Sequence, residues 1–175
     1  MTPQIKRILY ATDLSPNSVY ALRYAMDSAL KHHADLIILH VFEKVDPARN
    51  AWLDPYLYKE RHQRIYSEHI VETKDLIKKR LKAIRDDELK ELKNNNEFED
   101  MAISIEICEG FPAEEILSKA DEQNCDAIIM GTHSKGFIAN TFLGSTAKRV
   151  LRRARKPVFI IPLPKEEVNI TSHDI

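Results

Sequence analysis

The 175-residue chain is poor in cysteine, and it has neither a long apolar run nor an excess of charge of one sign. The spacing of Cys108 and Cys125 fits no metal-ligand pattern, so we interpret both as buried small hydrophobic residues. No apolar run approaches the roughly 18 residues that a membrane span needs. A net charge of -1 offers no whole-molecule attraction to nucleic acid or to an anionic membrane. We therefore expect it to bind neither nucleic acid nor a membrane. Because residues 1–6 lack the charged, apolar and small-residue order of a signal peptide, we also expect a cytoplasmic protein.

Glycine is also scarce, and its placement is informative. The chain has four glycines, and Gly131, Gly136 and Gly144 fall within one short stretch. Glycine permits positive φ and the close approach of another group to the backbone. The clustering by itself fits a plain connecting loop as well as a binding loop.

The pattern of apolar residues predicts alternating strands and helices. Apolar runs, one of them alternating with polar residues at period two, predict strands at 5–12, 36–41, 103–108, 127–130 and 157–162. Helical spacing predicts helices from Val19, over about 59–92, from Pro112 and over 144–154, with Ser15 as the N-cap of the first. Strands that are apolar on both faces suit a parallel sheet covered on both sides.

This element order predicts the fold. We expect a three-layer, doubly wound α/β domain over residues 1–163, with a five-stranded parallel sheet of order 3-2-1-4-5 and helices on both faces. The period-two strand at 103–108 has one wetter face and should lie near a sheet edge. Residues 164–175 show no pattern and are predicted to form a mobile tail.

The loop from Gly131 to Ser145 carries the clearest functional signal. Strand 1 ends at Asp13 and strand 4 at Gly131, on either side of the point where the strand order reverses, which is where such sheets bind ligands. The loop ends at a helix N-terminus, whose free N–H groups and dipole favour an anion. The hydroxyls of Ser145 and Thr146 can donate to phosphate oxygens. The loop matches neither a Walker motif nor a dinucleotide fingerprint.

The chain resembles the universal stress protein family over nearly its whole length. The resemblance rests on ATDLS at 11–15, IILHV at 37–41, EGFP at 109–112, MGTHSKG at 130–136, LGSTAKRV at 143–150 and KPVFIIP at 156–162. The nucleotide-binding branch of that family carries the pattern G-x2-G-x9-G-[S/T]. Gly131, Gly144 and Ser145 fit it, whereas Ser134 replaces the second glycine. That serine is either strained and crowds the phosphates or donates a hydrogen bond to them.

The resemblance implies an adenine-nucleotide site at positions matched one by one. Asp13 matches a nucleoside contact, Val41 lines the adenine pocket, and Ser134 belongs to the phosphate-contacting stretch. The candidate binding residues are Ala11, Thr12, Asp13, Val41, Met130, Gly131, His133, Ser134, Gly144, Ser145 and Thr146. The ligand implied is ATP, AMP or ADP, with Mg²⁺ or Mn²⁺ held through the phosphates.

Several residues have a simpler interpretation beside the functional one. Asp13 can brace the turn after strand 1, His133 can be a solvent-facing loop residue, and His40 is most simply a satisfied core histidine. The basic run 148–156 alternates with apolar residues at the end of a helix, which indicates a solvated face rather than a nucleic-acid site. The sequence leaves open whether the aromatic residues of 52–58 cover the site.

These observations lead to one principal hypothesis and one alternative. The principal hypothesis is a cytosolic regulatory protein that binds ATP or another adenine nucleotide; no catalytic constellation is present, so at most slow hydrolysis is expected. The alternative is a dimeric interaction module with a degenerate site, for which Ser134 is the main support. Apolar Val158 to Ile161 at a sheet edge predict a symmetric homodimer through strand 5. The sequence does not indicate other protein partners.

Overall fold

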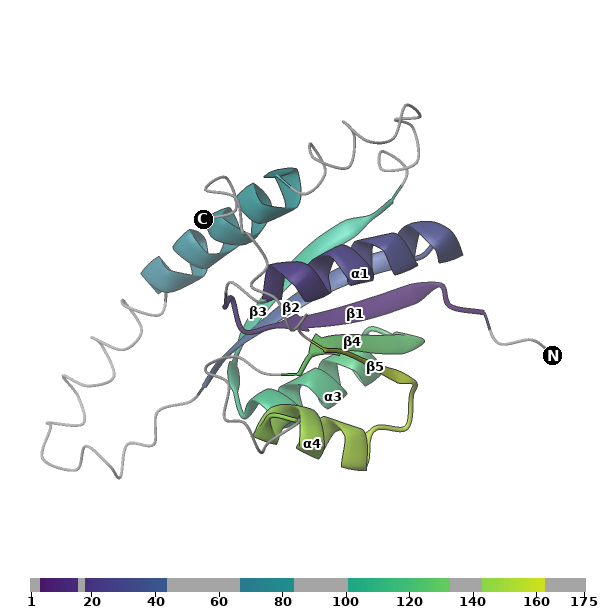
Figure 1. The fold of residues 1–175 in the computed structure, drawn as a ribbon. Helices are drawn as coiled ribbons and strands as arrows, with labels where there is room; N and C mark the ends of the chain where they lie inside the picture. Colours follow the sequence, from purple (N-terminus) through teal and green to yellow (C-terminus); the bar gives the residue numbers. More distant parts are fainter. Residues whose placement is uncertain (1–3, 16–17, 44–66, 84–100, 133–142, 163–175) are drawn as a thin grey trace, which may run out of the picture.

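The computed structural model describes residues 4–15, 18–43, 67–83, 101–132 and 143–162, and its core is one parallel sheet (Figure 1). The strands are β1 (Arg7–Thr12), β2 (Asp35–Glu43), β3 (Ile103–Gly110), β4 (Ala127–Gly131) and β5 (Val158–Ile161). They are ordered β3-β2-β1-β4-β5, and every neighbouring pair is parallel. The predicted doubly wound sheet of order 3-2-1-4-5 is therefore confirmed.

Helices cover both faces of this sheet. They are α1 (Ser18–His32), α3 (Pro112–Glu122) and α4 (Ser145–Arg153), and residues 67–83 are also helical. Figure 1 shows α1 and the 67–83 helix over one face, and α3 and α4 over the other. Such an arrangement follows when βαβ connections keep one hand and the chain reverses its direction of travel after β3.

Two apolar cores, one on each face, explain why the strands are so uniformly hydrophobic. Side chains of even-numbered residues in β1 and β2, such as Tyr10 and Ile38, pack under α1 together with Ile77 of the 67–83 helix. Odd-numbered residues, such as Leu9 and Leu39, pack under α3 and α4. Alternate residues of a strand point to opposite faces, so a sheet covered twice needs apolar residues at both parities.

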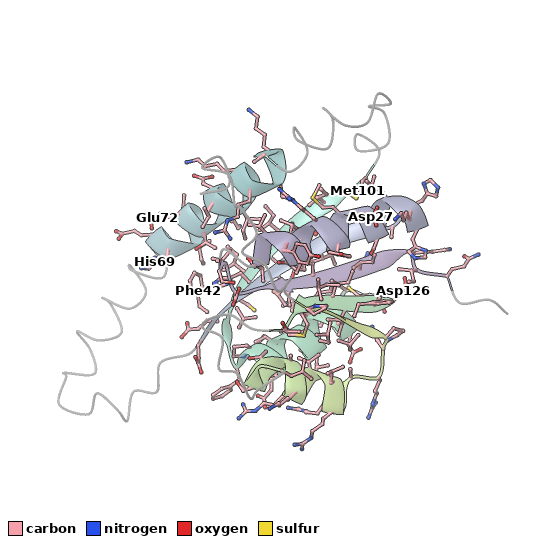
Figure 2. All side chains as sticks on the ribbon, viewed as in Figure 1. Asp27, Phe42, His69, Glu72, Met101 and Asp126 are labelled. Carbon is pink, nitrogen blue, oxygen red and sulfur yellow. The ribbon has the colours of Figure 1, made fainter. Side chains whose placement is uncertain are left out.

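The amino edge of the sheet is held by polar contacts. Asp126, which directly precedes β4, accepts hydrogen bonds at Oδ2 from the backbone N–H groups of Lys6 (2.7 Å) and Arg7 (3.0 Å). Figure 2 shows Asp126 at the opposite end of the sheet from Phe42 and His69. These contacts join the start of β4 to the start of β1, at the end of the sheet opposite the carboxyl ends of the strands.

The structure adjusts several boundaries predicted from the sequence. β1 begins at Arg7 rather than at residue 5, and β5 excludes both flanking prolines, as their missing N–H groups favour. β3 lies at the predicted edge position, where Ile103 is 37% exposed. Of the predicted 59–92 helix, 67–83 is helical, whereas its two ends, the 52–58 aromatic segment and residues 164–175 lie outside the described residues.

Candidate functional site

A cavity opens at the carboxyl edge of the sheet, at the boundary between β1 and β4. Its volume is about 330 Å³, within the usual range of small-molecule sites. Nine of the eleven candidate residues predicted from the sequence line it: Ala11, Thr12, Asp13, Val41, Met130, Gly131, Gly144, Ser145 and Thr146. The other two, His133 and Ser134, lie outside the described residues. Residues far apart in the sequence are thus brought to the point where the strand order reverses.

The turn that follows β1 presents Asp13 at this cavity. Leu14 has a φ of +62°, in the left-handed region that a bulky side chain rarely adopts. Its backbone N–H donates to Thr12 Oγ1 at 3.1 Å. The backbone N–H and the hydroxyl of Ser15 both donate to Asp13 Oδ1, at 3.0 and 2.7 Å. This local network maintains a strained backbone beside the cavity, as is common at functional sites.

Asp13 therefore has the bracing role expected from the simpler interpretation, and it also lines the cavity. The predicted cap role of Ser15 depends on residues 16–17, which lie outside the described residues, so it stays a prediction; the hydroxyl itself donates to Asp13, and α1 is described from Ser18. Ser15 still helps to start the helix, since its carbonyl accepts a hydrogen bond from the Ser18 backbone N–H at 3.0 Å.

The opposite wall of the cavity contains the N-terminus of α4. Gly144 is the N-cap residue and has no side chain to cap the helix. The backbone N–H of Lys148 is the first to bond within the helix, to Gly144 O at 3.0 Å. The N–H groups of Ser145, Thr146 and Ala147 thus have no acceptor within α4, and all three residues line the cavity. The helix dipole adds partial positive charge at the same place.

Gly144 is distinguished by close packing rather than by an unusual φ. Its φ is -63°, which any residue can adopt. Its N–H donates to Thr132 O at 2.8 Å, and a Cβ at this position would lie 3.1 Å from that same carbonyl oxygen. This contact joins the end of β4 to the start of α4. The same hydrogen bond occupies the Gly144 N–H, so an anion would be bound by the next three N–H groups.

The remaining walls are largely apolar. Val41 and Leu39 come from β2, Met130 from β4 and Ile116 from α3. No lysine or arginine lines the cavity within the described ranges; its carboxylates there are Asp13 and Glu43. The cavity therefore combines an apolar pocket, one acidic turn and one backbone anion site.

Two of the other residues that line the cavity, His40 and Tyr20, were not predicted from the sequence as site residues. His40 is 8% exposed and bonds Thr12 O through Nδ1 at 2.9 Å, so the core interpretation was correct as far as it went. Its position at the cavity was missed, because that depends on the pairing of Thr12 with His40 across two strands. Tyr20 was also missed; its hydroxyl lies 3.1 Å from that of Tyr24. An i, i+4 pair on a helix gives no sign of a nearby cavity.

Neither a metal centre nor a reactive thiol is found in the described segments. They contain no group of three or more His, Cys, Asp or Glu residues placed to hold a metal ion. Cys125 is buried as predicted, whereas Cys108 is only partly buried, at the margin of the same apolar core. Desolvation raises the pKa of both thiols to about 11, which disfavours the nucleophilic thiolate. The helices described are all too short or too polar to cross a membrane.

Comparisons with known proteins agree with the fold and the motifs. The sequence profile described as the Universal stress protein family matches residues 4–162. Universal stress protein MJ0531 of Methanocaldococcus jannaschii is 30% identical over 166 residues, which is 93% of this chain and 85% of that protein. The solved structure of protein MJ0577 is 26% identical and covers 94% of this chain and all of its own, with a TM-score of 0.66.

Two more distant solved structures have bound ligands. One is a universal stress protein in complex with cAMP, and the other is the universal stress protein from Archaeoglobus fulgidus in complex with dAMP. Each is 21% identical with a TM-score of 0.56; they cover 93% and 89% of this chain and 100% and 97% of their own. At that identity they show a shared fold. Together with the profile match, these comparisons establish that the chain belongs to the universal stress protein family.

Proposed function

We propose that this protein binds an adenine nucleotide in the cavity between β1 and β4 and acts as a ligand-dependent regulatory protein of the cytoplasm. The observation that carries the proposal is the meeting, in one cavity, of the Asp13 turn with the N-terminus of α4. An apolar pocket with an anion site at one end suits a ligand that has a flat base and a phosphate.

The phosphate end would be the first turn of α4. Three backbone N–H groups and the hydroxyls of Ser145 and Thr146 are available there, and hydrogen bonds to a charged group contribute roughly 1.5–3 kcal/mol each. A phosphate bound by backbone groups keeps oxygens free for a divalent cation. Mg²⁺ or Mn²⁺ would accordingly be held through the phosphates rather than by protein side chains.

The base and ribose would lie toward β1 and β2. Val41 and Met130 offer apolar surface for adenine. Asp13 Oδ1 is engaged in the turn, and no described residue donates to Oδ2. Oδ2 can therefore accept a hydrogen bond from the adenine amino group or from a ribose hydroxyl. The cAMP and dAMP complexes of the two distant relatives are consistent with this class of ligand for the fold.

Release of bound ligand and calorimetry would test the proposal. The protein is purified without added nucleotide and denatured, and the supernatant is analysed for adenine nucleotides; the native protein is then titrated with ATP, AMP and adenosine. We expect released nucleotide or a saturable heat with ATP or AMP. If neither is found, the proposal is wrong and the site is vestigial. If the wild type binds nucleotide, Ser134→Gly distinguishes the two interpretations of Ser134. The variant binds more tightly if the serine is strained and more weakly if its hydroxyl is a ligand.

A second proposal concerns assembly through the sheet edge. β5 is the last strand in the order, and Phe159 within it is 46% exposed. An exposed edge strand with apolar side chains favours pairing with another strand. We propose that two copies associate through Val158–Ile161 as a symmetric homodimer, independently of whether the cavity is occupied.

A further inference from the structure

His40 joins the second strand to the turn that carries Asp13. It is the last buried residue of β2, and it pairs in register with Thr12, the last residue of β1. Its Nδ1 lies 2.9 Å from the carbonyl oxygen of Thr12, and its ring packs edge-on against Phe42 with a centroid distance of 4.8 Å. The imidazole is thus fixed by one hydrogen bond, one aromatic contact and the surrounding sheet.

The hydrogen bond determines which ring nitrogen carries the proton. A carbonyl oxygen can only accept, so Nδ1 must be the donor. Burial lowers the pKa of His40, against smaller opposing effects of the Thr12 bond and the Asp13 charge. At neutral pH the ring is therefore uncharged, with its proton on Nδ1 and the lone pair on Nε2.

The orientation of the Thr12 carbonyl group affects the position of Asp13. It belongs to the peptide group whose nitrogen is that of Asp13, so its orientation sets where the Asp13 backbone begins. The next residue, Leu14, has a positive φ, which a local network must maintain. Inside that network the contacts come from Thr12, Asp13 and Ser15 themselves. His40 provides a contact from a different strand, and such a contact can fix the turn relative to the sheet.

We propose that His40 is a positioning residue of the nucleotide site, which holds the Thr12 carbonyl so that Asp13 points its carboxylate at the nucleoside. This rests on the proposed function, because Asp13 can be positioned only for a ligand that the cavity binds. The role belongs to the donor at Nδ1 and not to charge. An asparagine, whose amide nitrogen can donate from nearly the same place, should replace it; an apolar side chain of similar size should not.

The test measures adenosine affinity, because adenosine has the nucleoside but no phosphate. The full-length variants are His40→Asn, His40→Leu, Asp13→Ala and the double variant His40→Leu with Asp13→Ala. We expect His40→Leu to weaken adenosine binding roughly tenfold, the equivalent of one buried hydrogen bond, and His40→Asn to stay within about threefold of the wild type. In the Asp13→Ala background, His40→Leu should cost less than about twofold, because its effect passes through Asp13.

Thr73→Val is the matched control. Thr73 is a buried polar residue, 7% exposed, in the 67–83 helix, and it does not line the cavity. It should lower the free energy of unfolding without changing adenosine affinity. Nitrogen-15 NMR of the His40 ring gives a readout that is independent of binding, and we expect the neutral tautomer with the proton on Nδ1.

The possible failures are distinguishable. If the wild type binds neither adenosine nor ATP, the proposed function is wrong and this inference falls with it. If the wild type binds but the effects of His40→Leu and Asp13→Ala add fully, or His40→Leu binds as the wild type does, the positioning role alone is wrong. A ring proton found on Nε2 would also overturn it.

Discussion

Ser145→Asp should affect nucleotide affinity and protein stability in opposite directions. Ser145 is the first residue of α4, it is exposed, and it lines the cavity. α4 has no acidic residue in its first turn. A carboxylate there interacts favourably with the helix dipole, and we expect the free energy of unfolding to rise by roughly 0.3–1 kcal/mol. The same carboxylate would repel a phosphate bound by the adjacent N–H groups.

The size of that repulsion follows from Coulomb's law. At a separation of roughly 6 Å, two unit charges repel by about 3 kcal/mol with an effective dielectric constant near 20, and by less than about 1 kcal/mol in bulk water. Because Ser145 is exposed, an intermediate value applies. We expect affinity for ATP and AMP to fall roughly 5-fold to 50-fold at low salt, and by less as added salt screens the charges. Adenosine affinity should not change.

Isothermal titration of ATP, AMP and adenosine, together with urea denaturation, measures both effects. Ser104→Asp, at an exposed position of β3 away from the cavity, makes the same change in net charge and should leave all three affinities unaltered. The reasoning is refuted if Ser145→Asp binds ATP as tightly as the wild type does. Equal losses for ATP and adenosine would also refute it, because they would mean damage to the whole site.

Three further predictions concern assembly, pH and the amino edge of the sheet. Phe159→Asp should give monomers in sedimentation velocity, whereas Phe111→Asp, at an aromatic residue that is 56% exposed elsewhere, should not; an unchanged mass for Phe159→Asp contradicts pairing through β5. Because the pKa of His40 is lowered by folding from its ordinary 6.5, the unfolded chain binds the proton more tightly. The contribution of His40 to the free energy of unfolding should thus be complete above pH 6.5 and lost as pH falls through the folded pKa. Urea denaturation at several pH values should show that His40→Asn removes this part of the pH dependence of the unfolding free energy, and an unaltered pH dependence would contradict the prediction. Asp126→Ala, which removes two charged hydrogen bonds, should cost about 1–2 kcal/mol in urea denaturation. Asp121→Ala, which removes an exposed carboxylate paired with Lys156, should cost under about 1 kcal/mol, and equal costs would contradict the bracing role.

The fold was predictable from the sequence because its main signals are local. A strand buried on both faces must be apolar at both parities, so short apolar runs separated by helical spacing predict a covered parallel sheet. The alternating pattern of Ile103, Ile105 and Ile107 likewise indicated the edge strand, which the structure confirms. The order of the strands follows from connection rules rather than from particular residues.

The candidate site was predictable in part for the same reason. A ligand site at the reversal point follows from topology, and the Gly144–Ser145 step marks a helix N-terminus in the sequence. The scarcity of glycine also pointed to this loop, and of the two reasons given for glycine, positive φ and close approach to the backbone, the second applies at Gly144. Gly144 has an ordinary φ, and it is the close approach of the Thr132 carbonyl that would make a side chain there a tight fit.

The sequence by itself thus predicted the layers, the strand order and the end of the sheet at which the cavity lies, because those depend on periodicity and chain direction. Tertiary structure alone decided the contacts that shape the cavity. The bond from His40 to Thr12 requires a particular register between β1 and β2, and the positive φ of Leu14 requires a particular turn. Both depend on atoms of residues brought together by packing, and no local pattern specifies such a meeting. The sequence indicated that His40 is a core residue; the pairing of β1 with β2 also places it at the cavity.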